Sequence, residues 1–252
     1  MGWAGAEDIG GGMDRDSLAL EFYIEDHALL FGLMGKYAEE LCGKSGLEAL
    51  SHGVMLYGRE RGLRMAMRAR KNGDELDAVS YVIYGEWSDP KGSSHSEVRA
   101  YVPDYVYSCL SCGWCDTWKR YGLMEYGRIY CRYIDKSLLR GFSPKLELLI
   151  DGSLSEGDEA CVFTFKGADF IDEEGFQRAM ARKASMAEAN IRDFLYHTGH
   201  ICSALRRVFM LELGLLAAEE ICKMALSEFA KLMGAEKAEA VRIEAKQDFL
   251  SI

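Results

Sequence analysis

The scarcity of proline is the feature that most constrains how this chain can fold. Its 252 residues include only three prolines, Pro90, Pro103 and Pro144. Proline breaks a helix interior, so the stretches before the first and after the last proline are free to form long helices. Both stretches also space apolar residues three or four apart, as amphipathic helices do. The sequence therefore predicts long helices at both ends and a different organisation in the centre.

Turn signals and residue types set the boundaries of these parts. Residues 15–42 and 47–71 are predicted helices, the first with Asp14 or Asp16 as its N-cap. The centre is rich in Val, Ile and Tyr around turn-forming clusters, which predicts β-hairpins at 75–105 and 144–165 with helices between them. We therefore predict an α+β fold, with a small antiparallel sheet of two β-hairpins with intervening helices, flanked by N- and C-terminal helical hairpins.

The same boundaries predict one domain. The Gly-rich residues 1–14 are expected to be a flexible leader, and residues 15–252 a single α+β domain. Within that domain we expect three parts: a helical hairpin (15–72), a mixed sheet and helix core (73–170) and C-terminal helices (171–252). The long apolar helix faces at both ends are compatible with a homodimer.

Charge and cysteine usage narrow the classes of function. The formal net charge is −10, which argues against a nucleic-acid partner because the phosphate backbone is also negative. No apolar run approaches the roughly 20 residues of a membrane-spanning helix, and the N-terminus has no signal-peptide pattern, so we expect a soluble, cytoplasmic protein with no membrane partner. Under that expectation the eight cysteines are free thiols rather than a disulfide framework.

Three of these cysteines fall within the segment "CLSCGWC", at Cys109, Cys112 and Cys115. An iron–sulfur site would need loop ligands and a nearby fourth cysteine, whereas this segment has helical spacing. A structural zinc held by Cys112, Cys115, Cys131 and Cys161 stays open, although paired C-x₂-C knuckles are missing. The interpretation we favour is a helix whose Cys109 and Cys115 pack against the sheet, with no metal and no cofactor.

Several spaced features resemble the L-2-amino-thiazoline-4-carboxylic acid hydrolase family. That family has a Cys-Pro-Trp helix, a Tyr-Cys…Asp…Gly-Phe-x-Pro segment and a strand closing on Gly-Asp…Cys-x-Phe. The resemblance is best from about Leu76 to Phe165, and Gly113 stands where the family tends to have proline. A more distant resemblance, to four-vinyl-reductase-type domains, implies the alternative of a non-catalytic small-molecule-binding or sensory domain. The residues that match the family pattern are Cys112, Trp114, Cys131, Asp135, Gly141, Phe142, Pro144 and Cys161.

The family resemblance implies a hydrolase that opens a small cyclic amidine of the 2-aminothiazoline-4-carboxylate type, giving N-carbamoyl-cysteine. The attacked ring carbon lies between nitrogen and sulfur. Such a reaction needs a nucleophile and a group that moves protons. Cys112 and Cys131 are the candidate thiols, and Asp135, one helical turn after Cys131, is the candidate base or amidine partner. We expect these three side chains to converge beside a shared cavity.

Other residues are candidates for binding the substrate. Arginines are concentrated between positions 59 and 70, and such a run is usually a solvated helix face. Arg59 and Arg61 are the members expected to clamp a carboxylate, because they adjoin Gly58 and Gly62, where another backbone could approach. Central aromatic residues fit a pocket for a flat ligand. The predicted substrate-binding set is Arg59, Arg61, Trp114, Trp118, Tyr130, Cys161 and His200.

Overall fold

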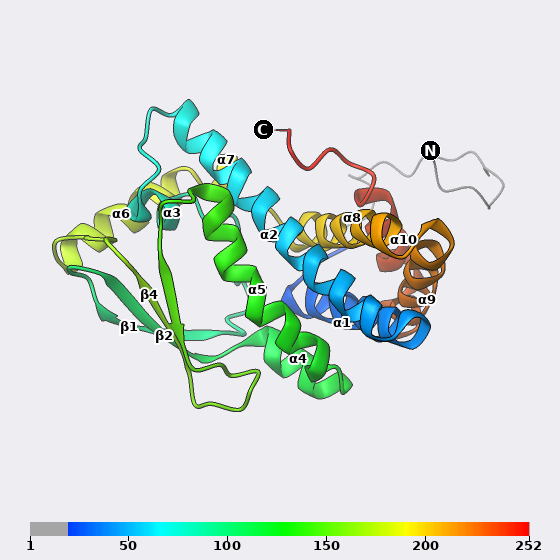
Figure 1. Cartoon of the computed structure of the whole chain (residues 1–252). Helices are drawn as coiled ribbons and strands as arrows, with labels where there is room; N and C mark the ends of the chain where they lie inside the picture. Colours follow the sequence, from blue (N-terminus) through cyan, green and yellow to red (C-terminus); the bar gives the residue numbers. More distant parts are fainter. Residues whose placement is uncertain (1–19, 252) are drawn as a thin grey trace.

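Residues 20–251 are the part of the chain that the structure, a computed structural model, describes. They form ten helices and four strands and confirm the predicted α+β class (Figure 1). The helices are α1 (Ile24–Cys42), α2 (Lys44–Lys71), α3 (Ala78–Ile83), α4 (Gly113–Tyr121), α5 (Met124–Phe142), α6 (Glu173–Ser185), α7 (Ala187–Asn190), α8 (Phe194–Glu212), α9 (Leu215–Met233) and α10 (Ala235–Glu244). The strands are β1 (His95–Ala100), β2 (Tyr105–Ser111), β3 (Leu148–Asp151) and β4 (Cys161–Phe165).

Two long helices, α2 and α5, pack against each other and connect the two halves of the molecule. Figure 1 shows the sheet on one side of this pair and the helices α1, α8, α9 and α10 on the other. One apolar core lies among those helices, α4 and the first halves of α2 and α5. A second core lies between the sheet, α3, α6 and the last parts of α2 and α5. The α2–α5 pair therefore contributes to both cores.

Glycines allow these two helices to approach closely. A Cβ atom at Gly62 would lie 2.0 Å from the carbonyl oxygen of Leu138, and one at Gly141 would lie 2.2 Å from that of Arg59. At Gly58 the corresponding backbone neighbour is the carbonyl oxygen of Ile134, at 3.0 Å. No side chain fits at such distances, so the predicted close backbone approach at Gly58 and Gly62 is confirmed.

The sheet is antiparallel throughout, with the strand order β1-β2-β4-β3. Its two hairpins are β1–β2 and β3–β4, and they join where β2 pairs with β4. In that register Cys109 lies opposite Cys161, and the rings of Tyr107 and Phe163 stack with their centres 4.8 Å apart. This central pairing fixes two thiols from distant parts of the sequence on neighbouring strands.

The first hairpin lies later in the sequence than predicted. Residues Ala78–Ile83 form α3 rather than a strand, because the Asp77 carboxylate accepts a hydrogen bond from the Ser80 amide at 2.7 Å and caps the helix. The hairpin is made by His95–Ala100 and Tyr105–Ser111 instead. The prediction of a strand over 75–87 is therefore wrong, although the second hairpin is where it was predicted.

The segment "CLSCGWC" is not one helix face. Strand β2 continues to Ser111, and α4 begins only at Gly113, so Cys109 belongs to a strand and Cys115 to a helix. Cys112 stands between them as the helix N-cap. The apolar period of three misled the prediction, because a strand that runs directly into a helix can carry the same spacing.

The start of the first helix also differs. Helix α1 begins at Ile24, where the Tyr23 amide donates a hydrogen bond to the Asp26 carboxylate at 2.9 Å. Residues 20–23 are not helical, which shortens the predicted helix over 15–42. The predicted caps Asp14 and Asp16, like the predicted leader 1–14, lie outside the described residues.

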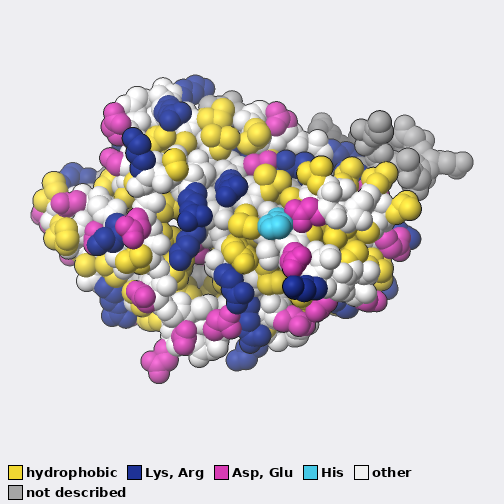
Figure 2. Space-filling view, viewed as in Figure 1, with side chains coloured by type: hydrophobic (Ala, Val, Ile, Leu, Met, Phe, Trp, Pro, Cys, Tyr) yellow, Lys and Arg dark blue, Asp and Glu magenta, His cyan; other side chains and the backbone are white. Residues whose placement is uncertain are grey.

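Basic side chains mark the exposed face of α5. They recur every fourth residue, at Arg128, Arg132, Lys136 and Arg140. Figure 2 shows Lys and Arg side chains in a column down the middle of this face of the molecule, over α5. Within residues 20–251, none of the helices combines the length and the apolar character needed to cross a membrane.

Candidate functional site

Five thiols gather where β2 ends and α4 begins. Cys109 comes from β2, Cys112 caps α4, Cys115 lies in its first turn, Cys131 comes from α5 and Cys161 starts β4. Their ionisations are linked: Cys109 and Cys115 both lower the pKa of Cys112, and Cys131 raises that of Cys115. We call these five residues the thiol cluster. The fold thus unites Cys112, Cys131 and Cys161, as the sequence predicted.

Cys112 is the thiol that this environment activates. The neighbouring Cys109 and Cys115 thiols hold the pKa of Cys112 well below its usual value, although burial opposes the shift. The backbone N–H groups of Trp114 and Cys115 favour the thiolate as well, although neither makes a full capping hydrogen bond to the sulfur. In return, the neighbouring Cys112 raises the pKa of both Cys109 and Cys115. Cys112 is half-buried, whereas Cys115 is buried.

Asp135 is the carboxyl group beside this cluster. Burial raises its pKa to about 6, the negative charge of Cys112 raises it too, and Arg61 opposes both. Within residues 20–251 its carboxylate makes no hydrogen bond to another side chain, and the residue is half-buried. Asp135 therefore has a pKa near neutral pH and free hydrogen-bonding capacity, which suits a group that gives and takes protons.

Arg61 links Asp135 to a buried ion-pair group. Its Nε lies 3.3 Å from the Glu86 carboxylate, which also accepts hydrogen bonds from Arg64 at 2.9 and 3.0 Å and from Arg68. Although burial opposes the shift, Arg64 and Arg61 hold the pKa of Glu86 far below its usual value. All four residues are buried. We call them the Glu86 cluster.

The Glu86 cluster corrects two predictions about the arginine run. Arg61, Arg64 and Arg68 are spaced three and four apart and share a buried face of α2, so the expected solvated face is wrong for them. Arg59 is exposed and lies away from that face. Arg61 is therefore the only one of the two predicted carboxylate-binding arginines that reaches the site, and its charge is already shared with Glu86.

The predicted aromatic residues are divided between the site and the core. Tyr130 is buried beside the cluster, and its hydroxyl lies 3.1 Å from Nε2 of His27. Trp114 packs against Trp87 at 5.3 Å between ring centres, and its buried Nε1 makes no hydrogen bond with any residue in the described part of the chain. Trp118 is fully buried and donates to the carbonyl oxygen of Ala28 at 2.8 Å. Trp118 is thus a core residue and lines no pocket.

His200 lies apart from the thiol cluster. It is fully buried, its Nε2 lies 2.8 Å from the Glu60 carboxylate, and its ring stacks on Phe249 at 4.5 Å. Its Nδ1 lies 3.3 Å from Arg64, so it joins the far side of the Glu86 cluster. Burial lowers the pKa of His200 to about 4 although Glu60 opposes the shift. The predicted substrate contact at His200 has no support in this placement.

Tyr81, Tyr107 and Glu86 belong to the surroundings of the site. The two tyrosines are among the central aromatic residues expected to line a pocket, whereas the sequence reasoning missed Glu86. Burial and the nearby charge of Asp135 raise the pKa of both tyrosines. Two of the three lie in the segment 75–87 that was misread as a strand. A signal for Glu86 existed in the three arginines on one helix face, since buried arginines require an acidic partner.

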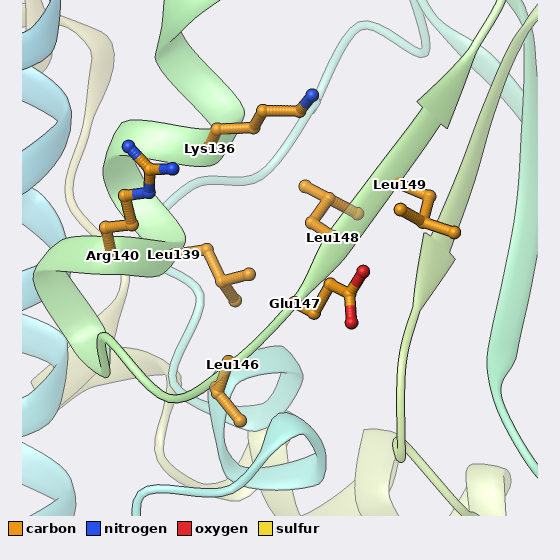
Figure 3. A pocket seen from close by; sticks show the side chains of 7 residues that line it. All are labelled: Lys136, Leu139, Arg140, Leu146, Glu147, Leu148 and Leu149. Atoms are coloured by element: carbon orange, nitrogen blue, oxygen red, sulfur yellow. The ribbon is translucent and has the colours of Figure 1, made fainter.

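Two hollows of the molecule lie away from the thiol cluster. One hollow, of about 260 Å³, is lined by α5 and the start of β3. Figure 3 shows it between Lys136, Leu139 and Arg140 on the helix and Leu148 on the strand. A second hollow, of about 460 Å³, lies at the start of α8 and the C-terminal segment. Neither is lined by the thiol cluster or Asp135, so the shared cavity stays a prediction.

Metal binding was the other use considered for the cysteines. Within residues 20–251, no group of three or more His, Cys, Asp or Glu side chains is arranged to hold a metal ion. The four cysteines weighed as zinc ligands are all free thiols.

Comparison with known proteins agrees with this geometry. The L-2-amino-thiazoline-4-carboxylic acid hydrolase family matches residues 22–165, more than half of the chain and all of the thiol cluster. The chain belongs to this family. The comparisons found no match among curated proteins or solved structures. The relation to four-vinyl-reductase-type domains, the homodimer and the cytoplasmic location stay predictions.

Proposed function

We propose that this protein hydrolyses 2-aminothiazoline-4-carboxylate or a closely related cyclic amidine, with Cys112 as nucleophile and Asp135 as the proton-transfer group. One observation carries the proposal: Cys112, which favours the thiolate, lies beside a carboxyl group of pKa about 6 and helps to raise that pKa. Such a pair provides a nucleophile and an acid or base at neutral pH. The family match supports the substrate class.

In the first step the Cys112 thiolate adds to the ring carbon of the protonated amidine. The ring carbon–sulfur bond then breaks, and the ring sulfur takes the proton of the Asp135 carboxyl group and leaves as a thiol. The carbon stays attached to Cys112 as an isothiouronium group. The negative charge that the thiolate brings is neutralised by the positive amidine, so the step needs no further charged group.

In the second step water adds to the same carbon and gives one proton to the Asp135 carboxylate. The Cys112 sulfur leaves as a thiolate, the proton carried by the amidine is released, and the product is N-carbamoyl-cysteine. One water is consumed and the protein is restored. A pKa near 6 fits Asp135 for both directions of transfer, because neither protonation state is strongly disfavoured at neutral pH.

Arg61 and Trp114 have supporting roles in this proposal. The positive charge of Arg61 lowers the pKa of Asp135 and so limits the rise that burial causes. We therefore assign Arg61 as a positioning residue. The Nε1 group of Trp114 is a buried donor in the first turn of α4, and it is available for a polar atom of the substrate. Cys131 contacts Cys115 and is the second candidate thiol.

The test is release of a thiol from 2-aminothiazoline-4-carboxylate, measured by titration of free sulfhydryl against the protein blank. We expect turnover by the wild-type protein and a loss of about 100-fold or more in kcat for Cys112→Ser and for Asp135→Asn, because general acid–base catalysis alone contributes about 10²–10⁴-fold. Cys42→Ser is the matched control, since Cys42 is another half-buried thiol, at the far end of α1.

Three results would contradict the proposal. These are no thiol release by the wild-type protein, undiminished turnover by Cys112→Ser, and equal losses in Cys42→Ser and Cys112→Ser. Cys131→Ser separates the two candidate nucleophiles: if it abolishes turnover while Cys112→Ser does not, the nucleophile is Cys131.

A further inference from the structure

Cys112 and Cys115 form a C-x-x-C pair at the start of a helix. Cys112 has an extended backbone (φ −142°, ψ 117°) as the N-cap, and Cys115 lies in the first turn of the nine-residue helix α4. The two side chains are near enough to interact, since Cys115 lowers the pKa of Cys112 and Cys112 raises that of Cys115. The hydrolysis proposed above uses Cys112 as nucleophile and gives the Cys115 sulfur no bond to form or break.

The backbone at this junction suits a disulfide between these two residues. Side chains three positions apart on a helix have Cβ atoms about 5–6 Å apart, and a small backbone adjustment at the helix start brings them to the roughly 3.5–4.5 Å that a disulfide requires. Cys109 also lies three positions from Cys112, but it is on β2, where residues advance about 3.3 Å each. Its thiol also donates to the carbonyl oxygen of Ser111 at 3.2 Å. Cys115 is therefore the better placed partner.

Cys112 and Cys115 also differ in burial and in pKa, as the two thiols of a thiol–disulfide exchange pair do. Cys112 is half-buried and favours the thiolate, whereas Cys115 is buried and keeps its proton. An exposed thiolate attacks an external disulfide, and a second, enclosed thiol beside it resolves the product. The remaining thiols of the cluster, Cys131 and Cys161, lie on other elements.

We propose that Cys112 and Cys115 are a redox-active dithiol that is oxidised to a disulfide by low-molecular-weight disulfides and returned by thiols. The Cys112 thiolate attacks one sulfur of the external disulfide, forming a mixed disulfide and releasing the first thiolate. Cys115 then attacks the Cys112 sulfur, the internal disulfide forms, and the second sulfur leaves with the proton of Cys115 as a thiol. Two electrons pass from the protein to the external disulfide.

Oxidation would also stop the hydrolysis, because the Cys112 sulfur would no longer be a thiolate. This consequence rests on the proposed function, whereas the dithiol itself does not. The two can fail separately: formation of the internal disulfide is read from mass, and ring opening is read from released thiol.

The experiment equilibrates the reduced full-length protein with glutathione buffers of increasing oxidised share, traps free thiols by acid and alkylation, and maps them by mass spectrometry. We expect the mass of the oxidised protein to fall by two hydrogens. Cys112 and Cys115 should escape alkylation together, and Cys109 should still be alkylated. Dithiothreitol should restore both labels. Circular dichroism confirms that the protein stays folded throughout the series.

Two single substitutions identify the resolving thiol. Cys115→Ser should accumulate a mixed disulfide of Cys112 with glutathione, since the resolving thiol is gone. Cys109→Ser, the matched control, should still form the internal disulfide. A disulfide between Cys109 and Cys112 in the wild-type protein would overturn the proposal, as would persistent labelling of Cys112 and Cys115 in fully oxidised glutathione while the protein is folded.

Discussion

At the scale of single residues, Asp135 is the proposed proton-transfer group, and its buried charge lowers the stability of the folded protein. Its carboxyl group has a pKa of about 6 in the folded protein because burial disfavours the charge. A raised carboxyl pKa means that the folded state binds the proton more tightly than the unfolded chain. The carboxyl group is therefore best tolerated at low pH, and folding stability is lost as the pH rises from about 4 towards 6.

Replacing Asp135 by Asn should separate function from stability. The amide has the same shape and no charge, so we expect Asp135→Asn to be more stable than wild type at about pH 8, by about 1–3 kcal/mol. Near pH 4 the two proteins should differ little, because the wild-type carboxyl group is then protonated in the fold. Urea unfolding at both pH values measures the difference, and the gain should accompany the loss of turnover.

An exposed aspartate provides the comparison for this prediction. Asp116 lies in the first turn of α4, where a carboxylate favours the helix N-terminus, and it is exposed. Asp116→Asn should therefore give no gain at high pH. If Asp135→Asn were less stable than wild type at pH 8, the carboxylate would have a structural partner and the assignment to catalysis would be wrong.

The sequence could predict which thiols belong to the site, but not the buried charged residue Glu86 near them. Cys112, Cys131, Cys161 and Asp135 could be predicted because each belongs to a spaced family pattern. Glu86 could not be placed in the same way, because it stands in the irregular segment between α3 and β1 and no local pattern marks a buried acid. Its burial depends on arginines of α2, about 20 residues earlier in the chain.

At the scale of secondary structure, the close packing of α2 on α5 positions Arg61 beside Asp135. Gly62, the next residue along α2, has the carbonyl oxygen of Leu138 only 2.0 Å from the position of a Cβ atom. Backbone cannot yield as a flexible side chain can. Any side chain at position 62 must therefore push the two helices apart.

Gly62→Ala should destabilise the protein by about 1–3 kcal/mol, the usual cost of forcing extra atoms into a packed core. A loss of stability is informative here, because Gly→Ala within a helix ordinarily stabilises a protein by about 0.5–1 kcal/mol. Gly32→Ala is the matched control: its nearest neighbours are side-chain atoms of Leu123 at 2.9 to 3.4 Å, which can move. Thermal unfolding of both variants gives the comparison, and a stabilised Gly62→Ala would refute the close approach.

The helices and the second hairpin were predictable because their periodicity extends over many residues. The first hairpin was not, since Val79, Tyr81, Val82 and Ile83 have strand-forming side chains and yet form α3 after the Asp77 cap. In "CLSCGWC" the opposite error occurred, and residues of a strand were assigned to a helix. Short elements are decided by caps and by packing against distant residues, and neither is visible in a local pattern.

At the scale of the whole molecule, the Glu86 cluster joins segments from both ends of the described chain. The Glu86 carbonyl oxygen accepts a hydrogen bond from the Arg192 amide at 2.7 Å, just before α8. Arg64 donates to the carbonyl oxygen of Phe249 at 2.6 Å. The family match ends at residue 165, so the later helices supply partners to residues inside the matched region.

This organisation predicts the effect of neutralising Glu86. Glu86→Gln leaves three buried arginines without their shared carboxylate, and we expect a loss of about 3–5 kcal/mol near pH 7 in urea unfolding. The pKa of Glu86 is lowered in the fold, so the stability that its charge supplies is present above the unfolded pKa and is lost as the pH falls. The cost of the substitution should therefore shrink in acid.

Glu156 is the matched control for this substitution, because it also contacts two arginines, Arg128 at 3.1 Å and Arg132 at 3.5 Å, but all three side chains are largely exposed. Glu156→Gln should cost at most about 1 kcal/mol at any pH, since solvent screens the pair. Equal effects of the two substitutions would mean that the buried charges do not hold α2 to the C-terminal segment. A large effect confined to Glu86→Gln would show that one carboxylate couples the arginine face of α2 to residues more than 100 positions later.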